Sequence, residues 1–96
     1  MRRDTALSKL RELLPALAAS DHVRALAIFG SVARDEAGPD SDIDIIVEYE
    51  RVPDFFSFVE LQDRLSEVLG WPVDLFTRNG LHPALRERIL QEAIYA

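Results

Sequence analysis

The sequence predicts a single α/β (α+β) domain in which a small mixed three-stranded sheet is flanked by about four helices. Three short apolar runs bounded by turn residues, at residues 23–29, 42–47 and 73–76, are typical of strands. The segments around them show the helical periodicity of apolar residues. A length of 96 residues allows one hydrophobic core, so we expect residues 1–96 to form one domain.

The composition argues against several classes of protein. Apolar residues make up 48% and charged residues 29% of the chain, as in an ordinary soluble globular protein. Without cysteine the chain has no disulfide framework or thiolate metal site, and its two histidines lack ligand spacing. A net charge of −6 argues against direct nucleic-acid binding, although acidity also serves solubility. No apolar run resembles a membrane span or a signal core, so we expect a cytoplasmic protein without membrane contact.

The first expected helix covers residues 4–19, with Asp4 or Thr5 as its N-cap. Leucines at helical spacing predict one buried face, formed by Leu7, Leu10, Leu14 and Leu17. Pro15 lacks an amide hydrogen and should kink the helix or end its regular part. A turn then leads into the first strand, residues 23–29, whose apolar character is typical of a strand covered on both faces.

A glycine, a serine and a short helical stretch follow the first strand. Gly30 permits a backbone conformation close to a ligand, and Ser31 opens a helical turn that runs to Arg34. Amide groups at such a turn, together with the Ser31 hydroxyl, can bind the phosphates of a nucleotide. Ser31 could also cap the helix. Arg34 could instead be a surface arginine paired with Asp35 or Glu36.

Two aspartates one residue apart stand at the start of the second strand. Residues i and i+2 of a strand point to the same face, so Asp42 and Asp44 should project side by side. Two adjacent carboxylates repel each other unless a cation lies between them. Oxygen ligands that are few and open to solvent suit Mg²⁺, which takes one or two carboxylates plus substrate phosphates. The alternative is an exposed acidic pair in a solvated turn.

The next helix and strand bring a third aspartate toward the same place. Pro53 and Asp54 begin a helix that ends at Gly70. Its expected apolar face comprises Phe55, Phe58, Val59, Leu65, Val68 and Leu69. A strand–helix–strand connection predicts a parallel right-handed crossover, whereas the short link between the first two strands makes them antiparallel. Gly30, the aspartate pair and Asp74 should therefore converge at one edge of the sheet, although Asp74 could also be an exposed strand residue.

A last helix is expected to begin at Pro83, after a turn. Its inward face would comprise Leu85, Ile89, Ala93 and Ile94. Tyr95 would then sit at the end of a terminal helix. Tyr49 lies at the far end of the second strand, about 20 Å from the aspartates at the usual rise per residue. Neither tyrosine is therefore expected close to the predicted metal site.

The pattern of Gly30-Ser31, ten residues and then Asp42-Ile43-Asp44 resembles the signature of the DNA polymerase β superfamily of nucleotidyltransferases. In a chain this short, the resemblance is to the minimal nucleotidyltransferases, the MntA-like antitoxins encoded beside HepT-like toxins of the HEPN class. The resemblance implies a nucleotidyltransferase fold, with ATP as substrate and Mg²⁺ as cofactor. It extends over essentially the whole chain, but only the two motif regions are specific.

The resemblance also implies roles for six residues. The implied catalytic and metal-binding set comprises Asp42, Asp44 and Asp74. The implied nucleotide-binding set comprises Gly30, Ser31 and Arg34. Family members often carry glycine after the motif arginine, where this chain has Asp35. Aspartate tolerates a left-handed conformation better than most residues, so we expect a local adjustment that keeps the site.

By this resemblance, the protein is an antitoxin that transfers AMP from ATP to a tyrosine of a HepT-like HEPN toxin and so blocks the toxin's RNase activity. Two alternatives remain open at the level of sequence. The protein could be a non-catalytic antitoxin that neutralises its partner by binding. It could also be a nucleotidyltransferase of a small hydroxylated molecule that acts with a separately encoded helical subunit.

Overall fold

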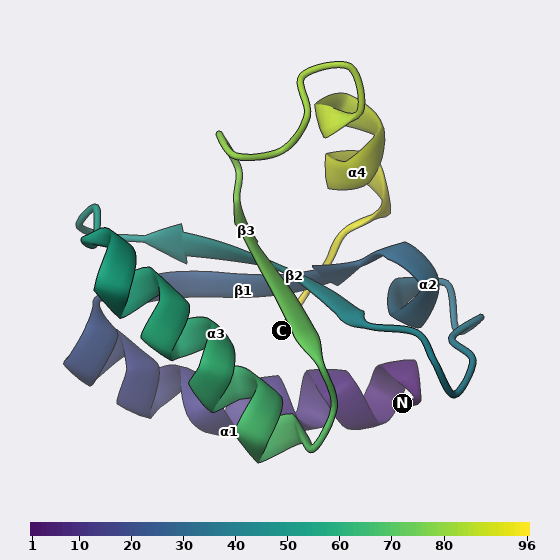
Figure 1. Ribbon diagram of the computed structural model, residues 1–96, viewed down its shortest axis with the longest axis horizontal. Helices are drawn as coiled ribbons and strands as arrows, with labels where there is room; N and C mark the ends of the chain where they lie inside the picture. The colour runs from purple at the N-terminus through teal and green to yellow at the C-terminus, as the bar shows by residue number, and fades with distance from the viewer.

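The computed structural model describes residues 1–96 and contains four helices and four strands (Figure 1). In chain order these are α1 (Arg3–Asp21), β1 (Val23–Phe29), α2 (Gly30–Ala33), β2 (Ile43–Tyr49), α3 (Phe55–Leu69), β3 (Val73–Thr77), α4 (Arg86–Glu92) and β4 (Ile94–Tyr95). The sheet has the strand order β3-β2-β1-β4. β1 runs antiparallel to β2 and β4, and β2 runs parallel to β3. The predicted fold class and strand directions are confirmed, with one strand more than predicted.

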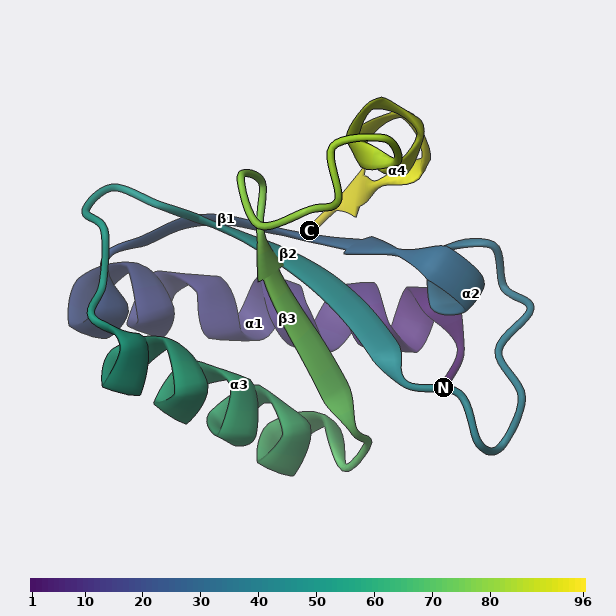
Figure 2. The same cartoon turned by 45° about the horizontal axis from the view of Figure 1, so that its top comes forward.

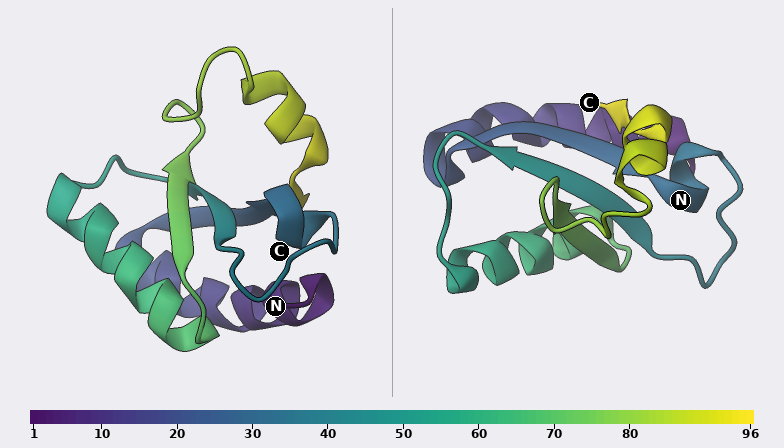
Figure 3. Two further views of the ribbon diagram at one scale, coloured as in Figure 1. Left: turned by 45° about the vertical axis from the view of Figure 1, so that its right-hand side comes forward. Right: turned by 90° about the horizontal axis from the view of Figure 1, so that it is seen from above.

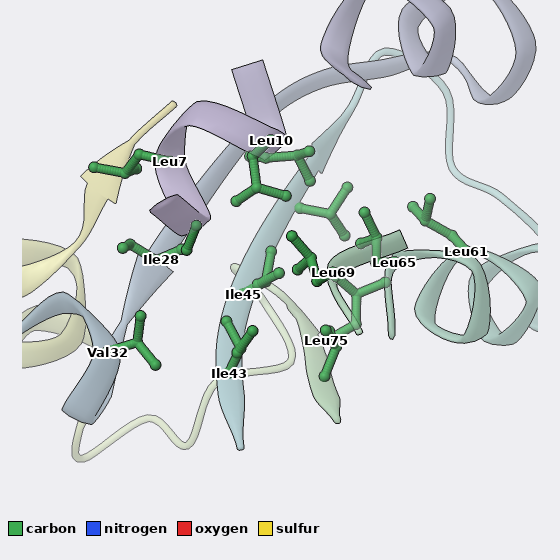
Figure 4. Packing of buried hydrophobic residues seen from close by; sticks show 14 of the residues in the cluster. Leu7, Leu10, Ile28, Val32, Ile43, Ile45, Leu61, Leu65, Leu69 and Leu75 are labelled. Atoms are coloured by element: carbon green, nitrogen blue, oxygen red, sulfur yellow. The ribbon is translucent and has the colours of Figure 1, made fainter. Parts of the chain in front are cut away.

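The two faces of the sheet carry separate apolar clusters. α1 and α3 cover one face, and α4 lies on the other (Figure 2, Figure 3). On the first face, 17 buried residues form the main core, where Leu10 of α1, Ile45 of β2 and Leu65 of α3 converge (Figure 4). On the second face, a small apolar cluster packs against Ile89 and Leu90 of α4. This small apolar cluster consists of Ala27, Phe29, Ile46 and Leu81.

β2 contributes to both clusters because its side chains alternate between the two faces of the sheet. Ile43 and Ile45 belong to the main core, whereas Ile46 belongs to the small apolar cluster. Asp44 and Glu48 lie two residues before and two residues after Ile46, so they share its face of the sheet. Two polar positions are thereby set on opposite sides of the small apolar cluster.

α1 is longer than predicted and passes through Pro15 without ending. It begins after Arg2, so Asp4 and Thr5 lie in its first turn and neither is the N-cap. Pro15 is exposed, while residues before and after it, such as Leu10 and Leu17, are buried against the sheet. Packing of this face outweighs the one backbone hydrogen bond that proline removes. No helix of the protein combines the length and apolar character needed to traverse a bilayer.

α3 has the predicted ends but a narrower buried face. Asp54 accepts a 2.7 Å hydrogen bond from the Ser57 amide as N-cap, and Gly70 closes the helix in the left-handed region. The buried residues of α3 are Leu61, Leu65 and Leu69. Phe55 is 74% exposed and Val68 is 45% exposed, so their predicted inward positions are wrong. At 3.6 residues per turn they point roughly 80° and 60° away from Leu65.

The C-terminal segment differs most from the prediction. The helix α4 begins at Arg86, after the predicted start at Pro83, and ends at Glu92. Residues 94–95 form β4, in which Ile94 pairs with Ile28 and Tyr95 pairs with Ala27 of β1. Tyr95 is therefore in a strand and not in a terminal helix. The edge of β1 offers unpaired backbone groups, which an added strand satisfies.

The predicted inward face of the last helix is correct only in part. Ile89 and Ala93 pack against the small apolar cluster, and Ile94 packs against the main core from β4. Leu85 is 46% exposed, so its predicted inward position is wrong. Ile94 reaches the opposite face from Ile89 because the chain changes from helix to strand at Ala93, which has extended backbone angles.

Candidate active site

The end of β1 is held against the start of β2 at Gly30. Phe29 pairs with Asp44 in the antiparallel register, so the next residue of β1 lies beside the Asp44 carboxyl group. Gly30 has a φ of +71°, a left-handed value that favours glycine. A Cβ atom added to Gly30 would lie 2.3 Å from Oδ2 of Asp44. Only glycine satisfies both conditions, which explains the residue type at this position.

The segment after Gly30 is a compact turn. Arg34 donates a 3.1 Å backbone hydrogen bond to the Gly30 carbonyl, and Glu36 donates one of 2.8 Å to the Ser31 carbonyl. Ser31 lies inside α2 and does not cap it, so the alternative role as N-cap is wrong. Asp35 has a φ of +60°, in the left-handed region that aspartate tolerates better than most residues. Its Oδ1 accepts a 3.2 Å hydrogen bond from the Arg3 amide, which ties the turn to α1.

The structure brings Asp42, Asp44 and Asp74 together. Asp44 and Asp74 are register partners in the parallel pair of β2 and β3. Asp42 lies one residue before β2, close enough for its carboxyl group to raise the pKa of Asp74. The start of β2 is joined to β3 by a 2.9 Å hydrogen bond from the Ile43 amide to the Pro72 carbonyl. The convergence that the strand directions predicted is therefore present.

The carboxyl groups at this edge have raised pKa values. Partial burial raises the pKa of Asp44 to about 6, and the charges of Asp74 and Asp42 add to this effect. Burial and the neighbouring Asp42 carboxyl group likewise raise the pKa of Asp74. The Arg34 guanidinium lowers the pKa of Asp44 but does not outweigh the other effects. A cluster of acids that resist ionisation is a favourable place for a cation.

The donor atoms at the site fit Mg²⁺ better than a metal that needs a complete protein cage. All are carboxylate oxygens, which hard cations prefer. No three His, Cys, Asp or Glu side chains of the protein are arranged so that they could hold a metal ion by themselves. Mg²⁺ normally retains waters and takes only one or two carboxylates together with substrate phosphates. Asp42 and Asp44 supply such a pair, with Asp74 beside them.

Glu92, at the end of α4, reaches the same site and was missed by the sequence analysis. Its Oε2 accepts a 3.2 Å hydrogen bond from the Gly30 amide, and its Oε1 accepts one from Nη1 of Arg34. Arg34 also donates a 3.3 Å hydrogen bond to Glu36, which is one of the two alternative partners considered for it. Glu92 is 58 residues from Arg34, so no local spacing could have revealed this contact.

A second polar cluster, formed by Arg24, Glu48, Arg78 and Tyr95, lies at the other end of β2. Glu48 accepts a 2.6 Å hydrogen bond from Nη2 of Arg24 and another from the Tyr95 hydroxyl. Nη1 of Arg78 lies 3.7 Å from the same carboxylate. A surface cavity of about 390 Å³ adjoins this cluster. Its charges are paired within the protein, unlike those of the three aspartates.

Sequence comparison finds relatives over most of the chain. Residues 7–96 match the family described as nucleotidyltransferase domain. The protein adenylyltransferase MntA of Thermococcus cleftensis is 40% identical over 73 residues, which cover 76% of this chain and 74% of that protein. The family match spans the glycine-serine segment, the aspartate pair and the third aspartate.

Comparison with solved structures agrees with the sequence matches. A protein proposed to be a minimal nucleotidyltransferase superposes with a TM-score of 0.79 and 39% identity, covering 98% of this chain and 95% of the other. A tri-AMPylated HEPN toxin of Shewanella oneidensis in complex with an MNT antitoxin also contains a matching chain. That match has a TM-score of 0.69 and 22% identity, and it covers 97% of this chain and 70% of the other. At this identity the likeness concerns the fold alone.

Proposed function

The chain belongs to the nucleotidyltransferase domain family, and we propose that it transfers AMP from ATP to a tyrosine of a HepT-like HEPN toxin. The related MntA of Thermococcus cleftensis is named as a protein adenylyltransferase. A HEPN toxin that carries three AMP groups has been solved with an MNT antitoxin of the same fold. Transfer of AMP to such a toxin would make this protein the antitoxin of a toxin–antitoxin pair.

The arrangement of charges supports this proposal. Asp44 lies beside Gly30 and near the guanidinium of Arg34, and Asp42 and Asp74 adjoin Asp44 on its other side. This combination suits a nucleotide whose phosphates need both a cation and hydrogen-bond donors. Asp42 and Asp44 would hold Mg²⁺, and Gly30, Ser31 and Arg34 would bind the phosphates. Bound Mg²⁺ would neutralise charge on the phosphates as the bond to the leaving group breaks.

The transfer itself is a substitution at the α-phosphorus. The acceptor hydroxyl oxygen forms a bond to the α-phosphorus while the bond from that phosphorus to the oxygen bridging to the β-phosphate breaks. Pyrophosphate leaves with the electron pair of the broken bond. Asp74 accepts the proton of the hydroxyl or completes a second metal position. Hydrogen bonds from Gly30 and Arg34 hold the phosphates in place during the transfer.

The two tyrosines of this chain support an acceptor on another molecule. Tyr49 is five residues beyond Asp44 along β2, roughly 17 Å away at the rise of an antiparallel strand. Its hydroxyl is buried and has no hydrogen-bond partner. The Tyr95 hydroxyl is bound to Glu48 at the same end of β2. Neither hydroxyl is at the edge of the sheet where the three carboxylates lie.

The direct test is incubation of the protein with α-labelled ATP, Mg²⁺ and the product of a neighbouring reading frame that encodes a HEPN protein. We expect label and a mass increase of one or more AMP groups on tyrosine peptides of the partner. Label on a small hydroxylated molecule would favour the other enzyme class. Stable, full inhibition of the partner by the Asp42→Asn protein, without any adduct, would favour neutralisation by binding alone.

A further inference from the structure

Glu92 binds two of the three residues that the proposed function assigns to the nucleotide phosphates, namely Gly30 and Arg34. One carboxylate oxygen accepts a hydrogen bond from the Gly30 amide, and the other accepts one from the Arg34 guanidinium. A carboxylate that bridges an amide and a guanidinium in this way resembles a phosphate oxygen pair in charge and in hydrogen-bonding pattern. The Gly30 amide and Nη1 of Arg34 therefore already have a hydrogen-bond partner before any ligand binds.

The position of Glu92 is set by the fold on both sides of it. Before it, Ile89 and Leu90 of α4 pack against the small apolar cluster. After it, β4 pairs with β1, and the Ala96 amide donates a 2.9 Å hydrogen bond to the Leu26 carbonyl. The side chain itself is less confined, since it remains 25% exposed. Glu92 can thus turn away from Gly30 by a rotation of its side chain, without movement of α4 or β4.

The charge of Glu92 is unfavourable for the aspartates beside it. Burial, Asp74 and Asp42 are the main causes of the raised pKa of Asp44, and the Glu92 carboxylate makes the smallest of these contributions. A fourth carboxylate would also repel the phosphates of an incoming nucleotide. A residue whose only task was to orient Arg34 would not need a second hydrogen bond to the Gly30 amide.

We propose that Glu92 is an internal stand-in for a nucleotide phosphate, which holds Gly30 and Arg34 until the nucleotide displaces it. This inference rests on the proposed function, because it assigns the same amide and guanidinium to the phosphates of the nucleotide. Binding of the nucleotide is then an exchange of one anion for another. Because the nucleotide must displace Glu92, the affinity of the site for nucleotide is lower than it would be without Glu92. A single anion that binds weakly does not displace Glu92.

The test compares Glu92→Gln with wild type in titrations with α,β-methylene ATP and Mg²⁺. Glutamine has the size of glutamate but loses the charge that competes with phosphate. We expect Glu92→Gln to bind the nucleotide about fivefold more tightly, the factor typical of a half-exposed ion pair. The matched control is Glu87→Gln, which removes the same charge from an exposed position on α4 and should bind like wild type.

The amide resonance of Gly30 gives a second readout that does not depend on transfer. In wild type, addition of pyrophosphate should move this resonance as Glu92 is exchanged for the added anion. In Glu92→Gln, the same movement should occur at lower pyrophosphate concentration. Equal or weaker nucleotide binding by Glu92→Gln, or equal tightening in both variants, would overturn the inference. Absence of an AMP adduct on the partner, with these binding differences intact, would instead overturn the proposed function.

Discussion

The two ends of β2 carry polar clusters of opposite character on the same face of the sheet. At the start of β2, three aspartates lie together, and the pKa of Asp44 is raised to about 6. At its other end, the hydrogen bond from Tyr95 and the ion pair with Arg24 lower the pKa of Glu48. The small apolar cluster separates the two ends.

This difference separates the proposed binding site from a cluster whose charges are paired within the protein. The carboxylate of Glu48 accepts hydrogen bonds from Arg24 and Tyr95, so the second cluster contributes to the stability of the fold. The carboxylates of the first cluster lack sufficient cationic partners, so they are suited to bind a cation from outside. A surface cavity adjoins the second cluster although its charges are paired, so a cavity by itself does not identify the proposed metal site.

The largest expected effect is on transfer by the Asp42→Asn and Asp44→Asn variants. Each change removes a proposed metal ligand, and we expect a loss of AMP transfer of at least about a hundredfold. Both variants should fold, because the change also relieves repulsion between carboxylates. Transfer is measured with labelled ATP and the partner, and thermal unfolding is measured without metal. Metal-free variants that melt at a lower temperature than wild type would mean that the aspartate pair is structural.

Asp74→Asn should lower transfer by roughly a hundredfold while it weakens ATP binding much less. The reason is that a tyrosine hydroxyl, with an ordinary pKa near 10, needs a base or a metal beside it at neutral pH. Single-turnover transfer and equilibrium binding of ATP separate the two effects. Equal losses in binding and in transfer would assign Asp74 to nucleotide or metal binding and not to the acceptor proton.

Glu48→Gln tests the other end of β2. We expect a loss of about 1 kcal/mol in the free energy of unfolding, because charge-assisted hydrogen bonds from Arg24 and Tyr95 are weakened. AMP transfer should remain close to that of wild type. Urea denaturation and the labelled transfer assay provide the two measurements. A large loss of transfer in a stably folded Glu48→Gln protein would contradict the division into a functional and a structural cluster.

The pH dependence of stability should distinguish the two clusters in the metal-free protein. The pKa of Asp44 is higher in the folded protein, about 6, than the ordinary value near 3.9 expected after unfolding. The folded state therefore binds more protons between these values, and the contribution of Asp44 to stability falls as the pH rises from about 4 to 6. The pKa of Glu48 is lowered, so its stabilising contribution is lost as the pH falls.

Urea midpoints at pH 4.5 and pH 7 for wild type, Asp44→Asn and Glu48→Gln measure these contributions. Relative to wild type, Asp44→Asn should gain stability between the lower and the higher pH. Glu48→Gln should lose more stability relative to wild type at the higher pH. If the difference in stability between wild type and Asp44→Asn does not change with pH, the pKa of Asp44 is not raised in the folded protein.

The smallest expected effect is that of Ser31→Ala. The Ser31 hydroxyl does not cap α2, so its loss should leave the fold intact. We expect nucleotide binding to weaken by a few-fold, in keeping with one hydrogen bond to a phosphate. Calorimetric titration with ATP and Mg²⁺ measures the change. Unaltered nucleotide affinity would remove Ser31 from the proposed nucleotide-binding set.

Much of the site follows from local sequence. Strand alternation and turn residues specify where β1 ends and β2 begins, and they bring Gly30 and Asp44 to the same edge. The left-handed backbone of Asp35 could be anticipated because only its own conformation is involved. The position of Asp74 followed from the parallel crossover, a rule that needs the order of the elements but no detail of packing.

Tertiary packing alone decided the rest. The contacts of Glu92 with Gly30 and Arg34 depend on α4 resting against the small apolar cluster, which has no signature in the spacing of residues. The pairing of β4 with β1 depends on an open strand edge far away in the chain. Local sequence determines local backbone, whereas contacts across about 60 residues depend on how separately formed elements pack. The sequence therefore indicated the groups that we propose for nucleotide binding, and packing decided that Glu92 contacts two of them.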